Sequence, residues 1–208
     1  MEQRIQQAAP GSSVMYLAID GVLEGAICLD DELRPEAHDV LERLRNAGIE
    51  RIVMLTGDSE TGARAVAERL GIDEVHAQVL PVQKSMFVQQ LRDAGYIVCM
   101  VGDGINDSPA LASADVSVAL ADASDIARAV ADVSVLDDSL EKLVALRQLA
   151  QATMARMRAG YRFIVALNTS LIVLGIAGIM PLTMAAFLHN ASTLGMAAAN
   201  TRDYLPEA

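Results

Sequence analysis

The chain has no run of lysine and arginine anywhere in its 208 residues. It contains 16 Lys and Arg against 27 Asp and Glu, so its formal net charge is −11. Nucleic-acid-binding proteins displace counterions from phosphates with clustered cations, so we expect no nucleic-acid partner. Residues 1–13 are polar and show no signal-peptide pattern, and we expect them to form a flexible tail. The sequence also lacks internal repeats and low-complexity segments.

Cysteine is scarce as well, with two in the whole chain, Cys28 and Cys99. Each lies within an apolar, strand-like run. We therefore expect small buried side chains in a reducing compartment, and neither a disulfide nor a metal-binding pair.

Charged residues are missing from two long segments, 163–180 and 182–200, of which the second contains a neutral His189. As helices, these segments would each be roughly 27–29 Å long, close to the ~30 Å hydrocarbon core of a bilayer. One helix across both segments would be about 57 Å long, which is too long for a single span. We expect the break between two helices at Gly178 and Pro181. We predict a connecting amphipathic helix at 141–161 and two transmembrane helices within 162–200. The alternative is a pair of buried helices in a soluble protein.

Arginines flank the two predicted membrane helices. Because positive charge is retained on the cytosolic side, they predict a multi-pass protein of the cell (plasma) membrane with both termini, including residues 201–208, in the cytosol. The arginines are Arg147, Arg156, Arg158, Arg162 and Arg202.

Upstream, short apolar runs alternate with amphipathic stretches from residue 14 to about 136, which is typical of a parallel α/β sheet. The predicted strands are 14–19, 26–29, 51–55, 74–76, 96–101, 116–119 and 133–136. The first two would be joined through a turn at 21–25. The predicted helices are 35–47, 60–70, 82–94 and 124–130, with a further helix that opens at Asn106.

The most informative segment is Val101–Leu111, where a strand enters Gly-Asp-Gly and a helix follows. Open parallel sheets bind ligands at the carboxyl ends of their strands, so Asp103 is expected at that edge. Asn106 and Asp107 approach it from the start of the next helix. Two carboxylates at one point predict a Mg²⁺ site beside a phosphate. The alternative is a tight turn in which Asp107 or Ser108 caps the helix.

This segment resembles the hinge motif GDGxNDxPAL of P-type ATPases. Residues 54–58 resemble the MLTGD segment of that family, residues 80–84 its P-x-x-K helix start, and residues 30–37 its D-x-x-R-P-E-A segment. Together they cover roughly residues 14–140, and their order and spacing suit the heavy-metal-transporting branch. The resemblance implies a Rossmann-like, haloacid-dehalogenase-type phosphorylation domain at 14–140, with helices on both faces of a parallel sheet and a transmembrane helical hairpin after it.

In this superfamily a carboxylate attacks a phosphoryl group, so catalysis consists mostly of neutralising and positioning charge. Asp103 would hold Mg²⁺ with Asp107, and Asn106 would donate to a phosphate oxygen. Thr56 would bind the phosphoryl group through its hydroxyl and backbone N–H, next to Gly57. Lys84 lies in the first turn of a helix, where a cation is unfavourable unless an anion is bound there. Asp58 is a weaker candidate because it could instead cap the following helix.

Polar residues also occur inside the predicted membrane helices, where they are costly and tend to be functional. Asn168 lies in the first helix, and four residues of the second fall on one helical face. With Asn168 they resemble the last two membrane helices of heavy-metal P-type ATPases and are candidate ligands for a transported transition-metal ion. The alternative is hydrogen bonding between helices. The four are His189, Ser192, Thr193 and Met196.

The nucleophile of the family is missing, because no D-K-T-G-T motif occurs. A Gly-rich nucleotide-binding domain, a T-G-E motif and a C-P-C-type membrane site are missing as well. Residues 18–22 invite comparison with the D-x-D-G nucleophile loop of haloacid-dehalogenase-type phosphatases, but Ala18 stands where the attacking acid belongs. Asp20 is the one remaining candidate.

We therefore predict part of a heavy-metal P-type ATPase that does not run the phosphorylation cycle alone. Mg²⁺ is its expected cofactor, a transition-metal ion its cargo, and an amino-terminal pump fragment or a full-length pump its partner. A gene fragment, a split pump and a degenerate paralogue all fit this interpretation. The rival hypotheses are a membrane-tethered phosphatase that uses Asp20, and a non-catalytic regulatory module of a pump.

Overall fold

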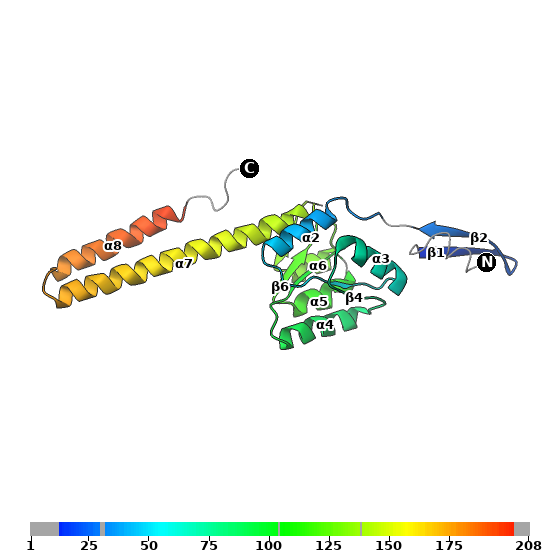
Figure 1. Ribbon diagram of the computed structural model, residues 1–208, viewed down its shortest axis with the longest axis horizontal. Coiled ribbons are helices and arrows are strands. Elements are labelled where there is room, and N and C mark those ends of the chain that lie inside the picture. Colours follow the sequence, from blue (N-terminus) through cyan, green and yellow to red (C-terminus); the bar gives the residue numbers. More distant parts are fainter. Residues whose placement is uncertain (1–12, 30–31, 104, 138, 202–208) are drawn as a thin grey trace. The chain divides into compact units, whose positions relative to one another are not determined.

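The computed structural model describes residues 13–29, 32–103, 105–137 and 139–201 (Figure 1). The chain divides into two compact units, residues 1–144 and 145–208. The first holds the expected α/β fold and the second two helices. The tails predicted at 1–13 and 201–208 lie almost wholly outside the described residues.

The first two strands form an antiparallel hairpin, β1 (Ser13–Ile19) and β2 (Val22–Leu29). The prediction that the second strand starts at Ala26 is wrong. Asp20 and Gly21 have φ angles of 50° and 80°, and two consecutive residues with positive φ make the tight turn that suits a two-residue hairpin. Pairing therefore continues up to Ile19 opposite Val22.

The parallel strands confirm the predicted fold class, but their hydrogen bonds divide them into two sheets. One pairs β3 (Val53–Leu55) with β4 (Glu74–His76). The other pairs β5 (Cys99–Gly102), β6 (Val116–Ala119) and β7 (Val133–Ser134). The strands β4 and β6 have the predicted bounds, whereas β3, β5 and β7 are shorter than predicted.

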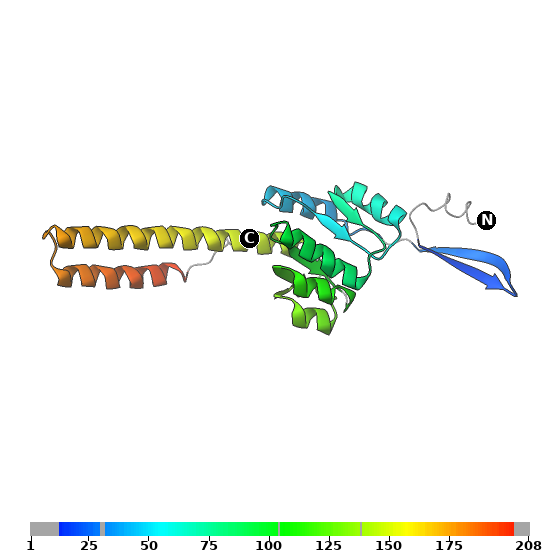
Figure 2. The same ribbon diagram turned by 90° about the horizontal axis from the view of Figure 1, so that it is seen from below.

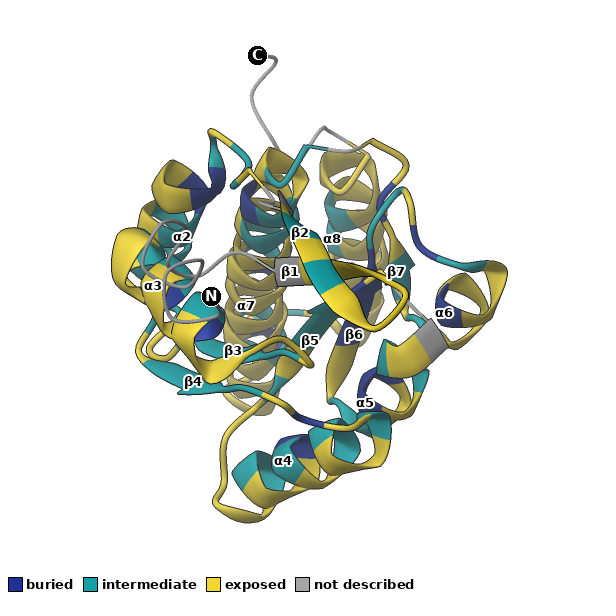
Figure 3. Cartoon of the chain, turned by 90° about the vertical axis from the view of Figure 1, so that its right-hand side faces the viewer, coloured by how far each residue is buried: buried dark blue, intermediate teal, exposed yellow. Residues whose placement is uncertain are grey.

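Helices connect these strands. Figure 3 shows α4 and α5 on one side of the strands and α2 on the other. α3 matches its prediction because Ser59 accepts a hydrogen bond from the Gly62 N–H at its start, and Gly71, with φ 66°, ends it. The helices of this unit are α2 (Ala37–Asn46), α3 (Glu60–Leu70), α4 (Pro81–Asp93), the 3₁₀ turn η1 (Ile105–Asp107), α5 (Ser108–Ser113) and α6 (Asp125–Val130).

Three of the four buried residues in the core around β5 and β6 are alanines. Leu111, Ala119, Ala123 and Ala127 are buried together, and Met100 packs against them. Small residues let the short helices α5 and α6 approach the sheet closely, which places the loops at its carboxyl edge.

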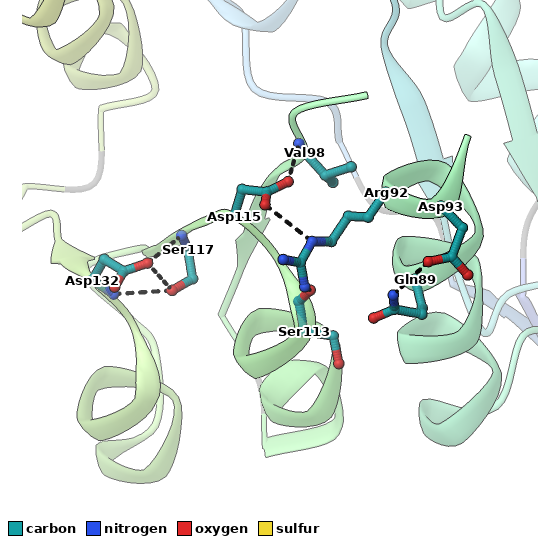
Figure 4. Close-up of polar contacts among 8 residues, drawn as sticks. All are labelled: Gln89, Arg92, Asp93, Val98, Ser113, Asp115, Ser117 and Asp132. Carbon is teal, nitrogen blue, oxygen red and sulfur yellow. Dashed lines mark hydrogen bonds and ion pairs between the residues drawn. The ribbon is translucent and has the colours of Figure 1, made fainter. Parts of the chain in front are cut away.

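Polar contacts fix the opposite, amino-terminal edge of this sheet (Figure 4). The Ser117 side chain and N–H both donate to Asp132 Oδ2, at 2.8 and 2.9 Å, and the Asp132 N–H donates back to Ser117 Oγ. Arg92 of α4 donates to Asp115 Oδ1, and the Val98 N–H donates to the other oxygen of that carboxylate. These contacts are remote from the carboxyl edge, so we assign them a structural role.

The second unit contains most of α7 (Glu141–Ile176) and all of α8 (Leu182–Ala199). Figures 1 and 2 both show α8 running back alongside α7. The predicted connecting helix and first membrane helix are one continuous helix, and the break falls where Gly178, with φ 68°, and Pro181 were expected to place it.

Among the described helices, α7 alone is long and apolar enough to cross a membrane. α8 does not qualify as such a helix, and the polar residues His189 and Asn190 lie in its middle. The second membrane helix therefore stays a prediction.

Candidate functional site

The loops after β3 and β4 are bonded to each other at the carboxyl edge of their sheet. The Val79 N–H donates to the Thr56 carbonyl at 2.9 Å, and the Gln78 N–H donates to the Asp58 carbonyl at 3.0 Å. Gln78 has a φ of 55°, a left-handed conformation that directs its N–H toward the first loop. The segment leading into α4 is thereby fixed beside Thr56.

Lys84 and Asp107 form the central ion pair of this edge. Lys84 Nζ lies 2.7 Å from Asp107 Oδ1, and their side chains are 12% and 13% exposed. The structure thus brings these two candidate site residues into contact. Asp107 itself supplies an anion that offsets the cation in the first turn of α4.

Gly102 makes room for Asp107. A Cβ atom on Gly102 would lie 2.9 Å from Asp107 Cβ and 3.1 Å from Asp107 Oδ2. Oδ2 has no hydrogen-bond partner among the described residues. Within the described part of the chain, Asp107 therefore has one oxygen on Lys84 and a second without a hydrogen-bond partner.

Thr56 and Asp58 form a second polar pair. Thr56 Oγ1 donates to Asp58 Oδ2 at 2.7 Å, and the Asp58 N–H donates to Thr56 Oγ1 at 3.1 Å. The Thr56 N–H donates to the His76 carbonyl, so the prediction that this N–H binds phosphate is wrong, because β4 uses it. The cap of α3 is Ser59, which excludes the capping role considered for Asp58. A Cβ on Gly57 would have only an ordinary contact, 3.9 Å from the Val79 carbonyl oxygen.

Asp103 and Asn106 lie close to Asp107 in the chain, and both are exposed. The Asp103 carbonyl accepts from the Ser124 N–H at 2.9 Å, which ties its loop to the start of α6. Gly104 lies outside the described residues. Across the described part of the chain, no three His, Cys, Asp or Glu side chains gather as a metal-binding group. The Asp103–Asp107 magnesium pair thus stays a prediction, and the carboxylate oxygens of these two residues are ligands of the kind that a hard cation prefers.

Asp20, the alternative nucleophile, lies exposed in the β1–β2 turn. That turn is not at the carboxyl end of a strand in either parallel sheet. Its position gives the phosphatase hypothesis no support.

A polar cluster at β4 and just before β3 was not predicted from the sequence. His76 Nε2 lies 2.8 Å from Glu74 Oε1, Arg51 pairs with the same carboxylate, and the His76 ring centroid is 4.1 Å from that of Phe87. Burial raises the pKa of Glu74, but the hydrogen bonds from His76 and Arg51 outweigh it and hold this pKa below its usual range. A three-residue strand gives too short a pattern to reveal such a cluster.

The second unit links two of the predicted cargo ligands directly. His189 Nδ1 lies 2.9 Å from Asn168 Oδ1, which joins α8 to α7. Ser192 and Thr193 donate to the His189 carbonyl at 2.7 and 3.0 Å, so their hydroxyls satisfy their own helix. Met196 approaches the other helix at Gly160, where a Cβ would lie 2.7 Å from its methyl group.

The sequence matches the haloacid dehalogenase-like hydrolase family over residues 2–115. It is 46% identical over 189 residues to the zinc-exporting P-type ATPase of Mycobacterium marinum and to the manganese-exporting P-type ATPase of Mycobacterium bovis, in each case over 90% of this chain and 26% of the relative. The crystal structure of a zinc-transporting PIB-type ATPase in the E2.Pi state is similar with a TM-score of 0.83 and 30% identity, over 95% of this chain and 32% of that one.

The chain thus spans about a quarter of the length of these curated relatives, at 26%. The similarity reaches through both units, since nine tenths of the chain aligns. The chain belongs to the haloacid dehalogenase-like hydrolases, within the branch of the heavy-metal P-type ATPases, and corresponds to part of such a pump.

Proposed function

We propose that this chain supplies the magnesium- and phosphate-binding half of a phosphorylation domain, together with two membrane helices, to an ATP-driven pump for a transition-metal cation. The largely buried ion pair of Lys84 and Asp107 is the observation that supports this most directly. The relatives named zinc-exporting and manganese-exporting make a transition metal the favoured cargo.

The chemistry follows from the side chains at that edge. Asp103 and Asp107 would hold Mg²⁺, which neutralises phosphoryl oxygens when it is bound. Lys84 offsets further negative charge, and the Thr56 hydroxyl and the Asn106 amide orient the phosphoryl oxygens. No carboxylate stands where the family's D-K-T-G-T nucleophile belongs, so the chain needs an amino-terminal pump fragment or a full-length pump as its partner.

In the membrane, His189 and Asn168 would present nitrogen and oxygen to the cargo ion, with Ser192, Thr193 and Met196 on the same face of α8. We propose that α8 crosses the bilayer like α7 and that the α/β unit and both termini face the cytosol. The apolar exposed residues of both helices support insertion, among them Ile172, Val173, Phe187 and Leu194.

Binding of inorganic phosphate in the presence of Mg²⁺ tests the proposal. The full chain in lipid nanodiscs is titrated and followed by ³¹P NMR line broadening. Replacing Lys84 by Met should weaken phosphate binding at least tenfold, because the desolvated cation is lost. Lys142→Met is the matched control, since Lys142 is exposed and pairs with Asp137, and it should change binding less than twofold. Equal effects of the two substitutions would contradict the proposal.

A second measurement addresses activity. The chain alone, incubated with labelled ATP, should give no acid-stable, hydroxylamine-sensitive phosphorylated band. Such a band would show that the polypeptide contains its own nucleophile.

A further inference from the structure

A cavity lies between α7 and α8, at the end of the helix pair that is remote from the connecting turn (Figure 2). Its volume is about 410 Å³, which falls within the range of pockets that bind small ligands. The buried Gly160 of α7 makes room for the Met196 methyl group, which would lie 2.7 Å from a Cβ at that position. The lining includes Arg156, Gly160, Phe163, Met196, Ala199 and Asn200.

The polar and the apolar parts of this lining are separated along the helix axes. Arg156 lies one helical turn before Gly160 in α7, and it is half-buried. Asn200 lies one turn after Met196, at the end of α8. Because the helices run in opposite directions, both polar residues lie on the side of the Gly160–Met196 contact that is remote from the connecting turn. Phe163 lies on the other side and is 50% exposed.

The cavity also spans the boundary at which charge disappears from α7. Arg162 is the last charged residue before the uncharged segment 163–180. Tyr161 beside it is 71% exposed, as is typical of aromatic residues at a membrane surface. In the membrane arrangement proposed above, this boundary lies in the cytosolic leaflet, where phospholipid phosphates meet their acyl chains. The polar end of the cavity then faces the headgroups, and the apolar end faces the hydrocarbon.

The guanidinium of Arg156 determines which headgroup suits the polar end. Its N–H donors match a phosphate in a bidentate manner, and the Asn200 amide can donate to a further phosphate oxygen. Arg156 also takes part in another interaction within the chain, and its five donors can serve two partners. Arg158 and Arg162 add positive charge at the same membrane surface, which attracts anionic lipids.

Other ligand classes suit the cavity less well. A free phosphate ester would occupy the polar end and leave Phe163 and Met196 in contact with water. A neutral, purely apolar ligand would fill the apolar end and offer the guanidinium no anion. A molecule with a phosphate next to an acyl chain satisfies both ends. Among phospholipids, an anionic one is favoured, because a choline or ethanolamine cation would approach the arginines.

We propose that this cavity binds one anionic glycerophospholipid of the cytosolic leaflet. Its phosphate contacts Arg156 and Asn200, and its glycerol and first acyl carbons lie against Phe163 and Met196. The proposal rests on the membrane insertion of α7 and α8 in the proposed function, and it adds a ligand that is neither the phosphoryl group nor the cargo. Because the lipid contacts both helices, it also links them at the end opposite to their turn.

Electron paramagnetic resonance of the full chain in phosphatidylcholine nanodiscs tests the proposal. Trace phosphatidylglycerol or phosphatidylcholine carries a spin label on the acyl chain near the glycerol, and the spectra separate lipid that the protein restricts from bulk lipid. The measurement is made at high ionic strength, which screens exposed charges more than half-buried ones. Phosphatidylglycerol should be preferred at least fivefold. Arg156→Met should reduce this preference below twofold, because the phosphate loses its charged donors.

Arg158→Met is the matched control for charge. Arg158 is exposed on the same stretch of α7 and does not line the cavity, so this variant should keep the preference within twofold of the unaltered chain. Ala199→Leu fills the cavity without changing the charge, and it should also reduce the preference below twofold. Ala197→Leu is its control, since Ala197 is exposed on α8 outside the lining. Millimolar glycerol phosphate, which has the phosphate without acyl chains, should displace no labelled lipid.

Equal losses in the Arg156 and Arg158 variants, or an unchanged preference after Ala199→Leu, would overturn the lipid site. Displacement by glycerol phosphate would assign the cavity to a free phosphate ester and overturn the lipid. Restricted lipid without a preference for phosphatidylglycerol would overturn the site alone, whereas the absence of any restricted lipid would overturn the membrane insertion on which it rests. Failure of the Lys84→Met phosphate titration beside an intact lipid preference would overturn the proposed phosphate chemistry and leave the lipid site standing.

Discussion

The replacement of Gly102 by Ala is the sharpest perturbation that the candidate site offers. Gly102 lies in β5 with an ordinary strand conformation, so alanine adds no backbone strain there. Its Cβ would meet Asp107 Cβ at 2.9 Å and Cγ at 3.3 Å. The nearest atom belongs to the rigid start of the side chain, so Asp107 has to move as a whole.

Moving Asp107 lengthens the distance from its Oδ1 to Lys84 Nζ, which is now 2.7 Å. Both side chains are largely buried, so water compensates little for the lost contact. Overpacking costs about 1–3 kcal/mol, and separating a largely buried ion pair adds to this. We expect the free energy of unfolding of the α/β unit to fall by about 2–4 kcal/mol.

Urea titration of the full chain in nanodiscs, followed by hydrogen exchange of the β5 and β6 amides, measures this loss. Gly25→Ala is the matched control, because Gly25 also lies in a strand and nothing lies within 4 Å of the added Cβ. It should change the free energy of unfolding by less than about 0.5 kcal/mol. A loss below that value for Gly102→Ala, or an equal loss in the control, would refute the packing argument.

Three further substitutions test other contacts. The two hydrogen bonds from Ser117 hold the pKa of Asp132 below its usual range, so the stability that Asp132 contributes is present above its unfolded pKa and is lost as the pH falls through the lower folded pKa. Ser117→Ala should therefore raise the Asp132 pKa in a carboxyl NMR titration, and an unchanged pKa would contradict this. Ser59→Ala should destabilise α3 by about 1 kcal/mol in urea titrations, whereas Ser59→Asp should keep the cap. In the second unit, Gly160→Ala should be tolerated because only the flexible end of Met196 stands in its way, whereas Gly160→Leu should lower the thermal stability of the helix pair.

The bounds of several elements could be predicted because local chemistry sets them. Ser59 and Gly71 define α3 from both sides, and the prediction of residues 60–70 was confirmed. The start of β2 was missed because an Asp-Gly turn needs only two residues, and the segment contains two glycines, Gly21 and Gly25, that could each belong to the turn. The strand β5 begins three residues later than its apolar run, because its pairing with β6 starts only at Cys99, opposite Val116.

The candidate site was predictable as a set of residues but not as a set of contacts. The motifs around Thr56, Lys84 and Asp107 could be assigned to loops that follow parallel strands, where such sheets bind their ligands. Which groups neutralise each other depends on distances between side chains that are 23 residues apart, as Lys84 and Asp107 are. The same limit explains the Thr56 N–H: a phosphate-binding role was compatible with its sequence, and only the pairing of β3 with β4 shows that this donor is already used. Local sequence therefore defines the chemistry that is available, and tertiary pairing decides how much of it is left for a ligand.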